Sequence, residues 1–187
     1  MVHWVHKSGA KYDDFLQPND TTYLERVASH NPDMVCVALA GNSVGSAQTV
    51  GQIKDRCQRF YRRLREFVPN AIIISTECEM RWYKPNNNWG GPLPVQYRAK
   101  MRTINTFMNR NVRVIDYIFQ LGGTRNGMIN RQFFDEDGCH LKEEHQDVYW
   151  TQLRHTVNYI HDDIDKRVRN QHLNLTINIA EVPKSSN

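Results

Sequence analysis

Short apolar runs alternate along this chain with longer amphipathic segments. Three such runs lie at residues 33–40, 71–75 and 112–117, and the first is entered through Pro32 and ended by Gly41-Asn42. Apolar runs of this length are typical of strands that are buried on both faces of a parallel sheet. Each of the three is therefore predicted to be a β-strand.

The segments between these strands have helical periodicity. Residues 49–67 place apolar side chains three or four positions apart, with arginines in between, which predicts an amphipathic crossover helix. Residues 97–108 predict a second helix, and residues 143–165 predict a closing helix. Strands that alternate with helices predict an α/β fold with a mostly parallel sheet and right-handed crossovers.

The two ends of the chain and one loop have patterns of their own. Residues 2–6 read as a short strand, and residues 173–179 alternate apolar and polar side chains strictly, which predicts a half-exposed edge strand. We expect one domain over residues 1–165 and a polar tail over residues 166–187. The loop at residues 84–94 has three asparagines, three prolines and two glycines, and it is a candidate rim or lid.

Composition narrows the class of protein. The 187 residues are 40% hydrophobic and 24% charged, as expected for one globular domain. No apolar run approaches the roughly 20 residues that span a bilayer, and no signal-peptide pattern opens the chain, so a cytoplasmic location is expected. The four cysteines form no CxxC pair, which predicts neither a disulfide framework nor a zinc site. We expect no cofactor and no metal.

The basic residues suggest one class of partner. The net charge of +4 is mild, but much of it lies in the helix at residues 54–65. Nucleic acid could be contacted there through Arg56, Arg59, Arg62 and Arg63, although such arginines more often form a solvated face. A non-catalytic interaction module, binding RNA or protein through this helix, is therefore one hypothesis for the function.

Candidate catalytic groups follow the predicted strands, where the loops of an α/β sheet converge. Asp137 precedes His140 by three residues, so its carboxylate can orient the imidazole as a general base. Gly9 follows the strand-like residues 2–6, and Asn42 follows the strand at residues 33–40. A glycine N–H and an asparagine amide are donors of the kind that stabilise the oxyanion in acyl transfer.

In order and spacing, Gly9, Gly41-Asn42 and Asp137-Gly138-Cys139-His140-Leu141 resemble the motifs of the SGNH (GDSL-type) hydrolase family over residues 2–160. The turn at residues 134–141 also looks like SGNH-type domains carried by retroelement-derived proteins. The resemblance implies a three-layer α/β/α sandwich with flavodoxin-like strand order. It also implies a serine esterase acting on a small ester or acetylated substrate, with His140 as base, Asp137 as its partner, and Gly9 and Asn42 as the oxyanion hole.

The sequence departs from the family pattern at the nucleophile. No Gly-Asp-Ser motif is present, and Ser43 follows Asn42 where the family often has aspartate. In the order 2-1-3-4-5 the motif lies on the central first strand. The resemblance therefore implies an amino-terminally truncated domain that lacks both this strand and its catalytic serine, and that is inactive as given.

Each candidate residue also has a simpler interpretation. Asp137 could cap the following helix, Asn42 could be a left-handed turn residue, and Gly9 could be a loop glycine. Ser8, Ser43 and Ser75 are the other serines that we weighed as nucleophiles, and Ser75 is read as a core hydroxyl. A metal site could be imagined from Asp137, Cys139, His140 and His145, but no second cluster has matching spacing.

Overall fold

The computed structural model describes residues 3, 5, 9–18, 20–78, 81, 94–119, 131–138 and 140–180. The chain divides into two compact units, Met1–His145 and Gln146–Asn187. The first unit contains the sheet and the helices that pack on it. The strand-like residues 2–6 and the loop at residues 84–94 lie outside the described part of the chain, apart from His3, Val5 and Pro94.

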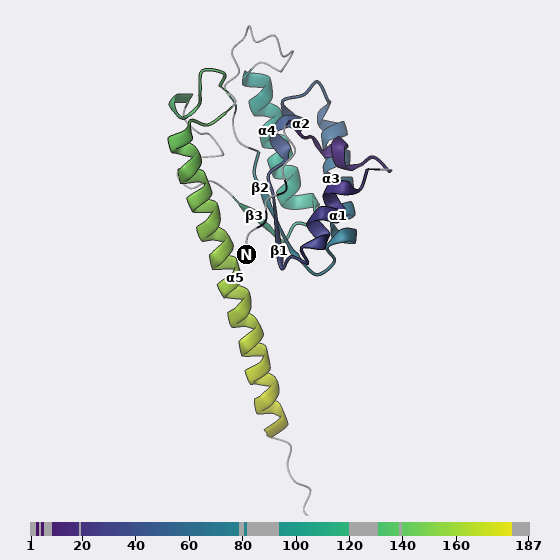
Figure 1. Cartoon of the computed structure of the whole chain (residues 1–187), viewed down its shortest axis with the longest axis vertical. Coiled ribbons are helices and arrows are strands. Elements are labelled where there is room, and N and C mark those ends of the chain that lie inside the picture. Colours follow the sequence, from purple (N-terminus) through teal and green to yellow (C-terminus); the bar gives the residue numbers. More distant parts are fainter. Residues whose placement is uncertain are drawn as a thin grey trace, which may run out of the picture. The chain divides into compact units, whose positions relative to one another are not determined.

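The first unit contains a small parallel sheet (Figure 1). Its strands are β1 (Met34–Val37), β2 (Ile72–Thr76) and β3 (Tyr117–Phe119), in the order β1-β2-β3. Met34 pairs with Ile72, and Ile74 pairs with Tyr117, both in parallel register. The predicted α/β class and the parallel sheet are confirmed.

The third strand begins later than its apolar run predicted. Within residues 112–117, the N–H of Ile115 donates to the carbonyl of Val112 at 3.1 Å and closes a turn. Val112 is only 5% exposed and belongs to the hydrophobic core. The apolar side chains therefore reflect burial of the turn rather than pairing in the sheet, and β3 starts at Tyr117.

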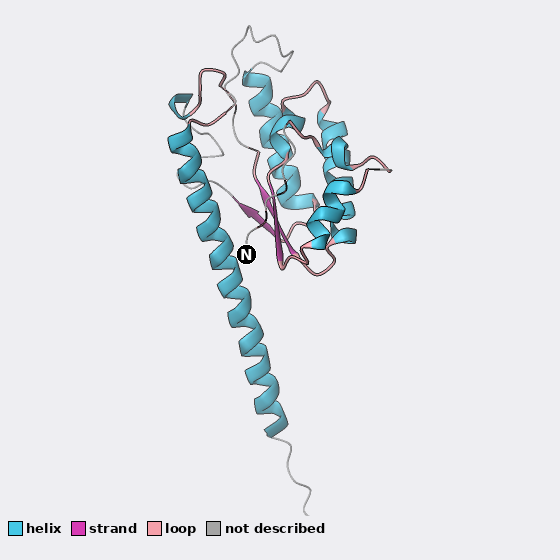
Figure 2. Ribbon diagram, in the orientation of Figure 1, coloured by secondary structure: helices cyan, strands magenta, loops and turns pink. Residues whose placement is uncertain are grey.

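Helices α1 (Thr22–Ser29), α2 (Ala40–Val44), α3 (Val50–Phe67) and α4 (Pro94–Asn111) lie on one side of the sheet (Figure 2). The predicted face of α3 is confirmed, because its apolar side chains are buried. Thr49 and Gln52 cap α3 reciprocally, each side chain accepting the other residue's backbone N–H. Two short 3-10 helices, η1 (Tyr12–Phe15) and η3 (Arg131–Phe133), complete the described elements of this unit.

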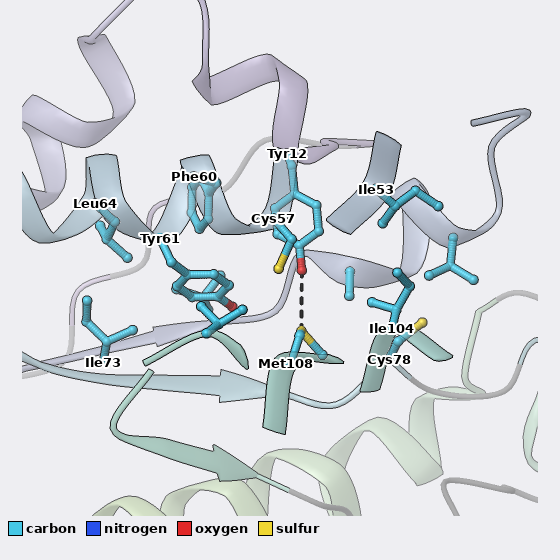
Figure 3. Close-up of a cluster of buried hydrophobic side chains, with 14 of the residues drawn as sticks. Tyr12, Ile53, Cys57, Phe60, Tyr61, Leu64, Ile73, Cys78, Ile104 and Met108 are labelled. Atoms are coloured by element: carbon cyan, nitrogen blue, oxygen red, sulfur yellow. Dashed lines mark hydrogen bonds between the residues drawn. The ribbon is translucent and has the colours of Figure 1, made fainter. Parts of the chain in front are cut away.

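The core lies between α3, α4 and the sheet (Figure 3). Tyr12 inserts from η1, and its hydroxyl donates to Sδ of Met108 at 3.6 Å. The Tyr61 hydroxyl donates to Oγ of Ser75 at 2.5 Å, and Ser75 is 1% exposed. Because buried hydroxyls require partners, these bonds allow polar groups in an otherwise apolar layer. The interpretation of Ser75 as a core hydroxyl is confirmed.

The closing helix, α5 (Glu143–Ala180), begins where it was predicted and continues far beyond residue 165. The edge strand predicted at residues 173–179 is wrong, because these residues continue α5. An established helix gains one hydrogen bond for each added residue, whereas an isolated strand needs a neighbouring strand to pair with. The domain boundary expected at residues 165/166 stays a prediction. Among the described helices, none is long and apolar enough to cross a membrane.

Candidate active site

The loop that carries Asp137 and His140 is closed by backbone contacts at both ends. Phe134 and Leu141 form an antiparallel bridge, and Lys142 donates to the carbonyl of Phe133 at 3.0 Å. At the tip, Gly138 has a φ of 67° and donates to Asp135 at 3.0 Å, which completes a tight turn. The loop therefore holds the tip residues in a defined geometry.

Both carboxylate oxygens of Asp137 bond to His140. Oδ2 lies 2.6 Å from the ring Nδ1, and Oδ1 accepts the His140 backbone N–H at 3.0 Å. An ionised carboxylate only accepts, so it favours the tautomer with the proton on Nδ1 and leaves Nε2 as an acceptor. The side chains are 48% and 75% exposed, so the imidazole is accessible. A general base needs such an accessible ring nitrogen that can accept a proton.

Asn42 lies in α2, directly after the carboxyl end of β1. Its Nδ2 donates to the carbonyl of Ala10 at 3.2 Å, so the amide faces the loop that contains Gly9. Gly9 has a φ of 66°, which a glycine adopts without strain. Asn42 is helical, so the interpretation as a left-handed turn residue is wrong. The structure therefore brings Asn42 to the Gly9 loop, and separately brings Asp137 to His140.

Arg81 contacts Asn42, and the sequence motifs did not indicate this contact. Arg81 lies beyond the carboxyl end of β2, and its Nη1 donates to Oδ1 of Asn42 at 3.0 Å. The guanidinium also lies against Gly41, where a Cβ would be 2.5 Å from Nη2 of Arg81. Its place after a strand was the available signal, but a contact across 39 positions has no local pattern in the sequence.

Cys78, just beyond the carboxyl end of β2, is anchored to α4 by Asn105. Oδ1 of Asn105 accepts the backbone N–H of Cys78 at 2.9 Å, and Nδ2 donates to the Cys78 carbonyl at 2.9 Å. Asn105 is 8% exposed, so both bonds are made in the interior. Its signal in the sequence was an amide among the apolar positions of a helix.

Ser43 and Ser75 are poorly placed for nucleophilic attack. Ser43 is 1% exposed and its Oγ accepts the backbone N–H of Tyr12 at 3.3 Å. Ser75 is equally buried, and Ser8 lies outside the described residues. Within the described ranges, no group of three or more His, Cys, Asp or Glu side chains is placed to hold a metal ion.

Most of the arginines proposed as a nucleic-acid contact make ion pairs or hydrogen bonds within the protein. Arg56 pairs with Asp13 at 2.7 Å, and Arg63 donates to the carbonyl of Gln17 at 3.0 Å. Arg59 pairs with Asp55 at 3.6 Å within the same helix. Arg62, with Gln58 and Arg113, lines a hollow next to the turn that precedes β3.

Three solved structures with a similar fold are named as a lipase, an acylhydrolase and an O-acetylesterase. A GDSL-like lipase of Bacteroides thetaiotaomicron has a TM-score of 0.58 and 16% identity, with 82% of this chain and 73% of that chain covered. A proposed acylhydrolase of Bacteroides fragilis has a TM-score of 0.55 and 16% identity, with 81% of this chain and 72% of that chain covered. A peptidoglycan O-acetylesterase has a TM-score of 0.52 and 15% identity, covering 87% of this chain and 45% of that one.

These identities are low, so the likeness concerns the fold. No protein-family model matches the sequence, and no curated protein matches it significantly. The comparisons give no support to nucleic-acid contact or to the narrower resemblance to retroelement-derived domains. The predicted resemblance of the fold is confirmed, and the chain has the α/β fold of the SGNH (GDSL-type) hydrolases.

Proposed function

We propose that this chain carries the base and the oxyanion donors of an SGNH-type serine esterase. The observation that carries the proposal is the 2.6 Å contact between Oδ2 of Asp137 and Nδ1 of His140. It leaves Nε2 of an exposed imidazole as a proton acceptor. The amide of Asn42, which faces the Gly9 loop, supplies the second half of the site.

In the proposed reaction, Nε2 of His140 takes the proton of a serine hydroxyl as its oxygen attacks the ester carbonyl carbon. Asp137 stabilises the imidazolium that forms. The carbonyl oxygen becomes negative and accepts hydrogen bonds from Nδ2 of Asn42 and the N–H of Gly9. His140 then returns the proton to the leaving alcohol, and water repeats both steps to release the acid.

The serine is the part that this sequence does not supply. The sequence has no Gly-Asp-Ser motif, and Ser43 and Ser75 are buried with their hydroxyls bonded. In the described sheet β1 is an edge strand, and its Cys36 is exposed. We propose that a strand carrying Gly-Asp-Ser pairs beside β1, and that without it the chain is inactive.

The proposed substrate is a small ester or an acetylated compound. The names of two similar structures, a lipase and an O-acetylesterase, support an ester bond as the target. The exposed position of His140 suits a substrate that reaches the base from solvent. The proposed reaction uses the serine, His140 with Asp137, the two donors and water.

Hydrolysis of p-nitrophenyl acetate tests the proposal. We expect no turnover by the 187-residue chain, and turnover by a longer chain with an upstream Gly-Asp-Ser strand. His140→Ala and replacement of the added serine should each abolish that activity, whereas His155→Ala, on an exposed position of α5, should not. Turnover by the short chain that survives His140→Ala would contradict the proposal.

A further inference from the structure

The oxygen and the nitrogen of the Asn42 side-chain amide make hydrogen bonds with partners of opposite kinds. Oδ1 accepts from Nη1 of Arg81 at 3.0 Å, and Nδ2 donates to the carbonyl of Ala10 at 3.2 Å. A guanidinium has only donors, and a backbone carbonyl only accepts. Turning the amide over would therefore set donor against donor and acceptor against acceptor. The NH₂ group is held on the side of the Gly9 loop.

We propose that Arg81 is a positioning residue, which fixes the Asn42 amide so that its N–H groups face the Gly9 loop. Its significance for catalysis rests on the function proposed above, whereas the orientation itself does not. A preorganised donor stabilises a developing oxyanion because it needs no reorganisation during the reaction. One N–H of Asn42 donates to Ala10, and the second has no partner among the described residues, which leaves it for an oxyanion.

Gly41 leaves room for the guanidinium of Arg81. A Cβ there would lie 2.5 Å from Nη2, 3.1 Å from Cζ and 3.3 Å from Nε of Arg81. Gly41 lies in α2 and is not among the residues with positive φ, so its backbone does not require glycine. Space for the guanidinium is the remaining reason for a glycine. An alanine would displace Arg81 while favouring the helix.

Cys78, which precedes Arg81 in the sequence, is anchored to α4. Asn105 bonds both the N–H and the carbonyl of Cys78, three positions before Arg81. The Cys78 sulfur also lies 3.2 Å from the Tyr97 hydroxyl of α4. Buried side chains of α4 thus fix Cys78 to the core. Asn105 of α4 holds Cys78, and Arg81 in turn holds the Asn42 amide.

The side-chain amide resonances of Asn42 test the proposal without any need for activity. Heteronuclear NMR spectra of the chain and of Asn42→Ala identify the NH₂ pair. In the unchanged chain, we expect hydrogen exchange of the proton bonded to Ala10 to be about tenfold slower than that of a free asparagine amide, the factor for one typical hydrogen bond. Arg81→Met and Gly41→Ala should each remove this protection, and Arg81→Lys should keep part of it.

The matched control is Arg59→Met, which changes an exposed arginine of α3 and should leave the Asn42 pair unchanged. Gly41→Ala should not lower the urea midpoint of unfolding, because alanine favours the helix. A loss of protection at Asn42 in this variant would therefore not be caused by a general loss of structure. An unchanged Asn42 pair in both Arg81→Met and Gly41→Ala would overturn the proposal.

The result also separates this proposal from the proposed function. In an active longer chain, Arg81→Met should lower kcat more than it raises KM, because the donor acts in the transition state. If that longer chain hydrolyses no ester, the proposed function fails while the amide measurement still decides the role of Arg81. If the esterase is active and Arg81→Met leaves kcat unchanged, the positioning role is wrong.

Discussion

Asp137 and His140 form a closed pair, in which one carboxylate binds both the ring Nδ1 and the backbone N–H of the histidine. The backbone bonds on either side of the turn hold this geometry, although the Asp137 and His140 side chains are exposed. A helix cap would leave the imidazole free to rotate. Here the carboxylate sets both the position and the tautomer of the ring, which makes the pair suitable for base catalysis.

The tautomer of His140 is the first prediction. In the unchanged chain, neutral His140 should carry its proton on Nδ1, because Asp137 accepts it. Asp137→Ala should shift the population toward the Nε2–H form, and long-range proton–nitrogen spectra of the ring report the change. His155, which is exposed on α5, serves as the internal control. An Nε2–H form already dominant in the unchanged chain would contradict the assigned hydrogen bond.

The glycine at the tip of the loop should be sensitive to substitution. Gly138 has a φ of 67°, and a left-handed conformation costs an L-residue about 1–2 kcal/mol. Gly138→Ala should therefore lower the free energy of unfolding by that amount in urea titrations. Gly51→Ala is the matched control, because Gly51 lies in the first turn of α3 and a Cβ there would make only an ordinary contact, 3.9 Å from Oγ1 of Thr49. It should be neutral or stabilising, and an equal loss in both variants would refute the argument.

Arg65 should contribute more to stability than any arginine of a solvated face. Its guanidinium links the end of α3 to the residues that precede β2 and β3, through the carbonyls of Pro69, Ala71 and Val114 and the carboxylate of Asp116. Arg65→Met should lower the free energy of unfolding by about 1–3 kcal/mol, since several acceptors lose a charged donor. Arg59→Met removes only an exposed pair within the helix and should cost about 0.5 kcal/mol or less. Similar losses in the two variants would argue against this role.

Stability should fall at alkaline pH because protonated groups are buried. Burial raises the pKa of the Cys57 thiol from 9.0 to about 12, and it also raises the pKa of the Tyr12 and Tyr61 hydroxyls. The folded state keeps these protons where the unfolded state releases them, so the stabilisation is complete below about pH 9 and is lost as pH rises toward the folded values.

Urea midpoints measured between about pH 7 and pH 10.5 check this dependence. Cys57→Ala should be less stable at neutral pH, because it leaves a cavity, but its midpoint should fall less steeply above pH 9. The same slope in both chains would show that the Cys57 thiol does not titrate differently in the folded state.

The features that the sequence predicted are those with local patterns. The face of α3 follows from helical periodicity, and Asp137 with His140 follows from a spacing of three residues on a turn. Parallel order of the strands follows from their alternation with helices. Each of these patterns is set by neighbours within a few positions of the chain.

The features that it missed depend on contacts between distant segments. Arg81 and Asn42 are 39 positions apart, and Asn105 and Cys78 are 27 positions apart. Alternation at residues 173–179 predicted a strand, but the preceding helix continues through these residues. The apolar residues Val112, Val114 and Ile115 suggested a strand, but they pack into the core from a turn. Tertiary context decided all of these features.

The distance from Nε2 of His140 to Nδ2 of Asn42 in an experimentally determined structure of this chain tests the central claim most directly. In a tetrahedral intermediate, the base lies about 3 Å from the attacking oxygen and the donor about 3 Å from the oxyanion, so the two nitrogens should lie within about 8 Å. We predict such a separation, with the Gly9 N–H directed at the same point. A separation well beyond about 8 Å, with both loops ordered, would contradict a shared esterase site.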